Sequence, residues 1–482
     1  MNTKINPYKA VFVAIIVLQT IFLISIPLIH LMNDSGWYFM NVHFVNTGNY
    51  INESRYPSFD EPSQLYSFFG YSFYLFICEK ISQIGIDFSL IVKFGQILMY
   101  IFSAIIVKKI MLIIVKKENL AYIIGIAFLL YYPFFNFVNL VMSEMYATFL
   151  ILLTCYYFMK IQVRFDKISA AILFLLAGYI ILVKPIFLPI SVAILVLYSI
   201  KVLYNRQYTF LPFVLLIVVF PLSQAIFSKN HYDNYKLQSG LGWHLWNRLI
   251  LYDKQIPESS VHLSELKAIY KAHNKPVSYG FWWDVTKDLS EFGYNEVETQ
   301  KICENIGKDA IAEKPVRFVM NTFKNSYYNF ITDNTQDWTY DNADQYLKRI
   351  AHFSTEQQHK PLTDQLSKQT YYSSYIFNDK LLTINNRFAQ FNYFNVIFHN
   401  SFVFLLYILA GIQIIYSLLY SRFKRNQKEF ILWFAAFAII FGSNFAEFPQ
   451  SRLIQPAVIF VILIVAIKLY ELKVYLTKPK EA

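Results

Sequence analysis

Cysteine and charged residues are scarce in this chain. Its 482 residues include three cysteines, of which Cys78 and Cys155 fall in apolar runs and only Cys303 lies in a polar stretch. No disulfide framework is therefore available to hold a small secreted domain together. Charged residues make up 16% of the chain, whereas soluble domains contain about 25%. These scarcities exclude a disulfide-stapled fold and argue against an ordinary soluble enzyme.

The signatures of several common enzyme classes are also missing. The sequence contains no P-loop, no glycine-rich nucleotide fingerprint and no defensible Ser/His/Asp pattern. Its nine histidines show no metal-ligand spacing. The sequence thus gives no support to a nucleotide-dependent enzyme, a serine hydrolase or a resident metal centre.

Apolar residues dominate instead, at 56% of the chain. They form runs of roughly 17 to 25 residues, each long enough to cross about 30 Å of hydrocarbon as a helix. We therefore expect an all-α polytopic membrane protein. About ten spans are predicted, at Ala10 to Leu31, Phe88 to Val115, Asn119 to Phe137, Glu144 to Ile161, Ile168 to Val183, Phe187 to Tyr204, Thr209 to Phe227, Val396 to Tyr420, Phe430 to Phe445 and Leu453 to Leu472.

The net charge of +11 lies in the membrane part. Ser228 to Asn395 holds 19 basic and 19 acidic residues, so the whole excess falls elsewhere. Lys and Arg enriched in short loops are typical of the cytoplasmic side of a membrane, and nucleic acid is not an expected partner. One topology puts every basic cluster inside, namely Lys4 with Lys9, Lys108 to Lys117, Lys160 to Lys167, Lys201 with Arg206, Arg422 to Lys428 and the C-terminus.

That topology depends on the segment Gln64 to Ile84. If this segment spans the membrane, either the N-terminus or every later basic cluster must face outward. Its Glu79 and Lys80, and its mixture of polar and aromatic residues, favour an interfacial helix. The first run, from Ala10, is too long for a signal peptide and is predicted to be a retained anchor.

This predicted topology divides the chain into three parts. Residues 1–227 form an N-terminal transmembrane module with an external loop at 32–87, residues 228–395 form an extracytoplasmic, mainly helical domain, and residues 396–482 supply the C-terminal transmembrane helices. Within the domain, Glu296 to Tyr328 reads as helical. The external loop, the domain and the short turns Val138 to Ser143, Lys184 to Ile186 and Ala446 to Arg452 then face one side and can share a cavity.

Asp34 is the leading candidate for chemistry. It follows the first span, so its carboxylate lies at the membrane surface, where an ionisable group is costly unless it has a partner or a task. A carboxylate near apolar walls has a raised pKa and can take a proton from a sugar hydroxyl. Capping of the next helix, or simple solvation of the loop, is the competing explanation.

The other external charges suit a phosphate and a hydroxyl. Lys184 and Arg452 can bind phosphate oxygens, although both can equally be residues that snorkel from span ends. Glu144 can contact the acceptor or interact with a helix dipole. Asp60 and Glu61 can contact substrate or be solvated loop charges.

The polar region from Ser228 to Asn395 contains two pairs of tryptophans. Trp243 and Trp246 lie in GWHLW, and Trp282 and Trp283 in FWWD. Their rings can stack on sugars, but tryptophan also fills small cores and membrane-interface belts. The structural explanation is the stronger of the two.

The order of these segments resembles the polyprenyl-phosphate-sugar-dependent glycosyltransferases of the GT-C superfamily, in particular protein mannosyltransferases and lipid A aminoarabinose transferases. The resemblance covers most of the chain. It is carried jointly by NDSGWYF, RYPSFDEPSQLYSFFGYSFYLF, PFFNFVNLVMSEMYATFLILL, LVKPIFLPI, DAIAEKPVRFVMNTFKNSYYNF and FPQSRLIQPAVIF.

This resemblance implies roles for individual residues. Asp34 would be the proposed base or acceptor-binding carboxylate, Lys184 and Arg452 the basic positions near the donor phosphate, and Glu144 the acidic residue at the outer end of the fourth span. Many protein mannosyltransferases carry an acidic pair after the first span, whereas here Ser35 follows Asp34. That departure puts a protein acceptor in doubt.

The sequence thus predicts an inverting membrane glycosyltransferase with a polyprenyl-phosphate sugar donor and an envelope glycan or glycolipid acceptor. The residue usage suggests a low-GC bacterium and its plasma membrane. A divalent ion between Asp34 and the phosphate stays open as a cofactor. An envelope polysaccharide polymerase is the first alternative, and a transporter or flippase for lipid-linked sugars is the second.

Overall fold

The computed structural model describes residues 6–25, 69–232, 240–263, 282–332, 397–420, 423–446 and 451–477, with residues 38, 41, 42, 45, 46, 235, 237 and 267 between them. Within these ranges the chain forms helices and turns, with no β-strand. Eight helices there are long and apolar enough to cross a membrane. The expectation of an all-α polytopic membrane protein is confirmed, whereas the count of ten spans is not.

The eight long apolar helices follow the predicted runs closely. They are α1 (Pro7–Ser25), α4 (Phe88–Val115), α7 (Ser143–Val163), η1 with α9 (Pro185–Phe187 and Leu188–Tyr204), η2 with α10 (Tyr208–Val218 and Val219–Tyr232), α20 (Ser401–Tyr420), α21 (Phe423–Ala446) and α22 (Ser451–Thr477). Two further apolar helices are shorter, α5 (Glu118–Leu130) and α8 (Lys167–Val183).

One predicted span, Asn119 to Phe137, is not a single helix. Helix α5 stops at Leu130, Tyr131 is extended, and a short helix α6 (Tyr132–Phe137) follows. Pro133 lies in the first turn of α6, where its missing N–H costs nothing, but it would disrupt a helix that ran through it. The apolar run thus bends before it reaches the turn that leads to Glu144.

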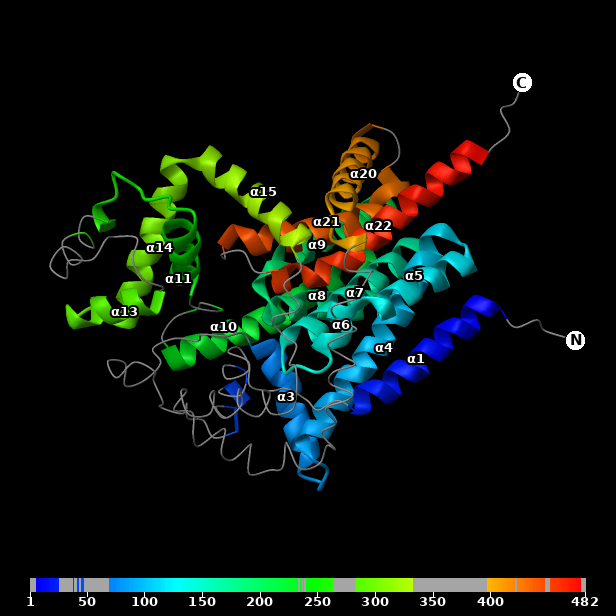
Figure 1. The fold of residues 1–482 in the computed structure, drawn as a ribbon, viewed down its shortest axis with the longest axis horizontal. Helices are drawn as coiled ribbons and strands as arrows, with labels where there is room; N and C mark the ends of the chain where they lie inside the picture. Colours follow the sequence, from blue (N-terminus) through cyan, green and yellow to red (C-terminus); the bar gives the residue numbers. More distant parts are fainter. Residues whose placement is uncertain are drawn as a thin grey trace, which may run out of the picture.

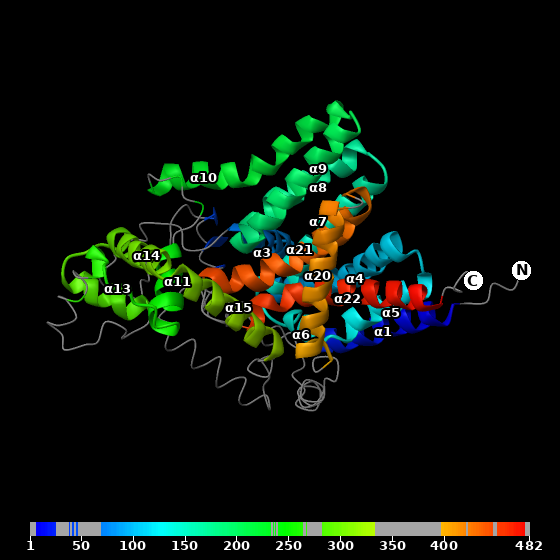
Figure 2. The same ribbon diagram turned by 90° about the horizontal axis from the view of Figure 1, so that it is seen from above.

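The membrane helices share one core, with α7 near its centre. Helix α7 packs against α4, α8, α21 and α22, whereas α1 lies along α5 at the edge (Figure 1). Figures 1 and 2 place the start of α1 and the end of α22 at the same end of the molecule. Helices α11 (Leu241–Leu245), α13 (Trp282–Glu291) and α14 (Glu296–Glu313) lie toward the opposite end.

The region after residue 228 has a small core of its own. It is built from α11, the π-helix η3 (Trp246–Tyr252), α13 and α14. The predicted helical stretch from Glu296 to Tyr328 is broken at Lys314, because Pro315 begins a new helix, α15 (Pro315–Ile331). Helix α15 leaves this core and packs against α20, α21 and α22. The domain boundaries at 228 and 395 stay a prediction.

Helix α3 (Phe69–Ser82) is the described part of the segment whose topology was in question. Its 14 residues extend about 21 Å, which is short of a bilayer core of about 30 Å. It packs on α4 and α8, and a Cβ added at Gly70 would lie 2.5 Å from the carbonyl oxygen of Leu182. Its first turn thus packs against the end of α8, and the interfacial placement of the segment stays a prediction.

This close approach predicts that Gly70→Ala destabilises the protein. A methyl group at Gly70 must push α3 away from the backbone of α8, and overpacking of this kind costs about 1–3 kcal/mol. The melting temperature of purified protein in detergent should fall measurably. Ser82→Ala is the matched control, since the Ser82 hydroxyl bonds only to Glu79 within α3. Equal melting temperatures for the two variants would contradict the packing described here.

Candidate active site

A buried ion pair between Glu144 and Lys184 lies at the centre of the candidate site. Lys184 Nζ donates to Glu144 Oε1 at 2.9 Å, and the two side chains are 15% and 1% exposed. Glu144 is the second residue of α7, and Lys184 caps the carboxyl end of α8. The pair therefore joins the ends of two adjacent antiparallel helices.

Local sequence explains why these two side chains meet. Pro185 disfavours helical geometry at the residue before it, so Lys184 is extended and α8 ends there. Glu144 lies in the first turn of α7, where a carboxylate is stabilised by the helix dipole. The helix dipole thus accounts for the position of Glu144 in the first turn of α7. The ion pair with Lys184 is an additional interaction that was not predicted from the sequence.

Lys184 does not snorkel from its span end to solvent. Its ammonium group is held by a carboxylate that is almost fully buried, so that explanation is wrong for this residue. The pairing also neutralises much of the charge that Lys184 would offer to a phosphate. A phosphate site on this face needs further positive charge.

Tyrosines surround the ion pair on the side of α3. Tyr71 and Tyr146 lie with ring centroids 5.7 Å apart, and Tyr71 is close enough to Glu144 to interact with it electrostatically. Tyr146 donates to the hydroxyl of Tyr179 at 2.9 Å, and Tyr179 donates to the carbonyl of Gly70 at 2.6 Å. These rings hold α3, α7 and α8 together around the carboxylate.

A second buried lysine, Lys93, lies one helical turn before Gln96, which contacts Tyr71. It lies in α4, is 2% exposed and donates a hydrogen bond to Asn139 Oδ1. One turn further on, Gln96 donates to the hydroxyl of Tyr71 at 3.2 Å and to the carbonyl of Leu140 at 3.1 Å. Sequence reasoning missed Lys93, although an ionisable residue inside an apolar run is itself a functional signal.

The remaining predicted site residues are not placed with respect to this cluster. Asp34, Asp60 and Glu61 lie outside the described residues. Arg452 is the second residue of α22, and its side chain is also outside the description. At the level of helices, η1, which follows Lys184 directly, packs on α21, the helix that precedes α22. The roles of all four residues stay predictions.

The region between η3 and α21 contains a second buried charge. Arg248 is fully buried, forms an ion pair with Asp253 and donates from Nε to the carbonyl of Asn444 at 3.0 Å. Burial lowers the pKa of Arg248 to about 10, so the side chain remains charged at neutral pH. Trp243 and Trp246 pack nearby in buried positions, which favours the structural explanation for these two rings.

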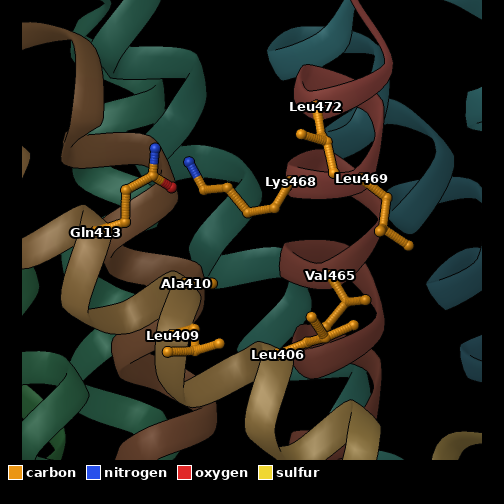
Figure 3. A pocket seen from close by; sticks show the side chains of 8 residues that line it. All are labelled: Leu406, Leu409, Ala410, Gln413, Val465, Lys468, Leu469 and Leu472. Atoms are coloured by element: carbon orange, nitrogen blue, oxygen red, sulfur yellow. The ribbon is translucent and has the colours of Figure 1, made fainter. Parts of the chain in front are cut away.

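A separate groove lies between α20 and α22. Its volume is about 200 Å³, and its lining is mainly leucine together with Gln413 and Lys468 (Figure 3). Lys468 is paired with both Glu429 and Glu471, so the groove offers no net positive charge. It does not resemble a phosphate site. No group of three or more potential metal ligands occurs in the part of the chain that the structure describes.

Comparisons with known proteins give a distant structural likeness. No family model matches the chain, and no curated protein matches it. The structure is similar to the oligosaccharyltransferase of Archaeoglobus fulgidus in its apo form, with a TM-score of 0.38, and to the same enzyme, AglB, in complex with an inhibitory peptide and a dolichol-phosphate, with a TM-score of 0.39. Sequence identity is 10% in both comparisons.

The chain spans about half the length of that enzyme, since the matches cover 96% and 98% of this chain but 51% and 53% of the other. A likeness at this TM-score carries no conclusion about activity, donor or acceptor. The proposal for function depends on the residues of the site.

The buried pair predicts a strong coupling between Glu144 and Lys184. Glu144→Gln or Lys184→Met leaves one charge buried without its partner, which typically costs about 3–5 kcal/mol. The double variant removes both charges, so it should lose clearly less stability than the two single losses added together. Thermal unfolding of the four proteins in detergent measures this coupling. Additive losses would show that the two side chains do not interact in the folded protein.

Proposed function

We propose that this chain is a membrane glycosyltransferase that moves a sugar from a polyprenyl-phosphate-linked donor to an envelope glycan or glycolipid on the extracytoplasmic face. The observation that carries the proposal is the buried cluster of charged and hydroxyl-bearing side chains around Glu144, Lys184 and Lys93 at one end of the membrane helices. Such groups can bind a phosphate and sugar hydroxyls beside an apolar path for a lipid chain.

The chemical step follows from the groups assigned. The donor enters sideways from the bilayer, with its phosphate near Lys184 and Arg452. Asp34 takes the proton of an acceptor hydroxyl, whose oxygen attacks the anomeric carbon. The bond from that carbon to the phosphate oxygen breaks, and polyprenyl phosphate leaves with the electron pair. A single displacement of this kind inverts the anomeric configuration.

The ion pair changes the role proposed for Glu144. Because one carboxylate oxygen is bound to Lys184, Glu144 first holds that lysine in place. Its other oxygen, Oε2, has no hydrogen-bond partner and is the atom left to accept from a substrate hydroxyl. Asp60 and Glu61 remain proposed acceptor contacts on the external loop.

The rival functions differ in what they require. A polymerase would use the same cluster with a growing glycan as donor, and the bound lipid would then carry a polymer. A transporter would favour charges at mid-membrane and paired broken helices. Here Glu144 and Lys184 both lie at helix ends, which favours transfer.

The proposal predicts that Asp34→Asn abolishes transfer while the donor stays bound. Loss of a general base typically lowers the rate by about 10² to 10⁴, and an enzyme that cannot react should keep its lipid-linked sugar through purification. Native mass spectrometry would identify the donor by its mass. Glu258→Gln, which alters an exposed carboxylate, is the control. Full activity in Asp34→Asn would eliminate the base assignment, and loss of the lipid on adding Arg452→Ala would support a phosphate contact there.

The topology predicts that residues 52 and 258 face the same side. In intact cells, cysteines introduced as Asn52→Cys and Glu258→Cys should both react with a membrane-impermeant thiol reagent. Lys167→Cys, at the first residue of α8, should react only after the cells are opened. The native cysteines provide little background, because all three are buried. Labelling of residues 52 and 258 from opposite sides would rule out a shared external site.

A further inference from the structure

The charges of the candidate site do not balance. Its described members are two lysines, Lys93 and Lys184, and one carboxylate, Glu144. Lys184 is paired, but Lys93 takes part in none of the ion pairs among the described residues and has Asn139 Oδ1 as its hydrogen-bond acceptor. A buried ammonium group without a counter-ion is costly. The charged form of Lys93 is therefore favoured only when an anion lies beside it.

Asn139 presents a further donor beside this charge. The lysine ammonium can only donate, so it fixes the amide oxygen of Asn139 toward Lys93 and leaves the Nδ2 group on the other side. Asn139 is 1% exposed, and its Nδ2 atom has no hydrogen-bond partner. An ammonium with spare N–H groups next to a buried, unpartnered amide N–H is a donor set suited to an anion.

The same cluster also contains unpartnered acceptors. Gln96 donates from Nε2 to Tyr71 and to the carbonyl of Leu140, which fixes its orientation and leaves Oε1 without a partner. Glu144 Oε2 is likewise buried and unpartnered. Buried polar atoms are normally satisfied, so several unsatisfied ones in one cluster call for an explanation. Acceptors of this kind suit hydroxyl groups.

A single molecule that supplies an anion and hydroxyls would satisfy all of these atoms. We propose that Lys93 and Asn139 bind the phosphodiester of the lipid-linked donor, and that Gln96 Oε1 and Glu144 Oε2 accept hydrogen bonds from its sugar. This inference rests on the proposed function and deepens it, because it adds Lys93 to Lys184 and Arg452 as a basic residue at the donor phosphate. A phosphodiester carries one negative charge, which would pair with the single charge of protonated Lys93.

The assignment also explains why Lys184 can be paired with Glu144. Lys184 forms an ion pair with Glu144 and so holds that carboxylate in place. Lys93 has no carboxylate partner among the described residues, so it can pair with the phosphate. Without donor, keeping Lys93 buried as an ammonium group carries a free-energy cost. Bound donor relieves that cost.

Two variants of the full-length protein separate binding from structure. Lys93→Met removes the unpaired charge, and Asn139→Asp gives Lys93 a permanent internal counter-ion of nearly the same shape. We expect both to melt at or above the wild-type temperature without ligand, and to bind polyprenyl phosphate about tenfold to a hundredfold more weakly, which is the usual effect of losing a hydrogen bond to a charged group. Lys80→Met, which alters an exposed lysine of α3, should bind as the wild type does.

The probes are polyprenyl phosphate, the uncharged polyprenol and inorganic phosphate, each added to purified protein in detergent, with the melting temperature and the dissociation constant as readouts. Binding of polyprenyl phosphate but not polyprenol, lost in both variants, supports the proposal. Undiminished binding in Lys93→Met overturns it but leaves the proposed function standing. A melting temperature that falls in both variants, with binding kept, makes Lys93 a structural residue.

The remaining outcomes test the source of the anion. If inorganic phosphate binds in a manner that depends on Lys93 while polyprenyl phosphate does not, the anion site is real, but the lipid donor is wrong and the proposed function fails with it. If the wild type binds none of the three probes, both the inference and the phosphate part of the proposed function are overturned.

Discussion

The contact between Glu144 and Lys184 is the constraint on which the rest of the site depends. Two charges are taken out of water at the ends of α7 and α8, and in a low-dielectric surrounding each tolerates burial only with the other present. The pair therefore fixes the distance between these helix ends. Since α3 packs against the same end of α8 through Gly70, and η1 packs on α21, this contact links α7 and α8 directly to α3 and, through η1, to α21.

The same burial makes this end of the molecule chemically selective. Few polar groups lie there, and several are hydrogen-bonded to one another: Tyr146 to Tyr179, Tyr179 to the carbonyl of Gly70, and Gln96 to Tyr71. Atoms left over in such a network are costly to the free protein. A protein that keeps them gains specificity for a ligand able to fill them, at the expense of stability when the ligand is absent.

Much of the membrane part could be predicted from the sequence, because apolar runs and helix ends are local properties. Phe88 to Val115 was predicted with the observed bounds, and several other helices differ from the prediction by a few residues. The two broken helices were missed although each break has a local cause, Pro133 in one and Pro315 in the other. In the first case the long apolar run predicted one continuous helix, and in the second the polar helical pattern did so. The proline that breaks the helix was visible in the sequence in both cases.

The contacts of the site could not be predicted in the same way. Glu144 and Lys184 were both singled out as candidates, yet their pairing joins residues 40 positions apart and depends on how α7 and α8 pack. Lys93 is different, because a lysine five residues inside an apolar span is visible in the sequence alone. It was not predicted as a site residue, because the predicted topology placed the external surface, and with it the candidate charges, at the span ends.

The region after residue 228 is tied to the membrane helices by a second buried charge, and this tie bears on the site. Arg248 extends from η3 to the carbonyl of Asn444, near the end of α21, while Asn329 of α15 donates to the side chain of Asn444 at 2.7 Å. A guanidinium group at the carboxyl end of a helix is stabilised by the helix dipole, and its ion pair with Asp253 keeps it in place. The end of α21 is thus held by both η3 and α15, and α22, the next described helix, carries Arg452. These contacts tie the position of the region after residue 228 to that of α21.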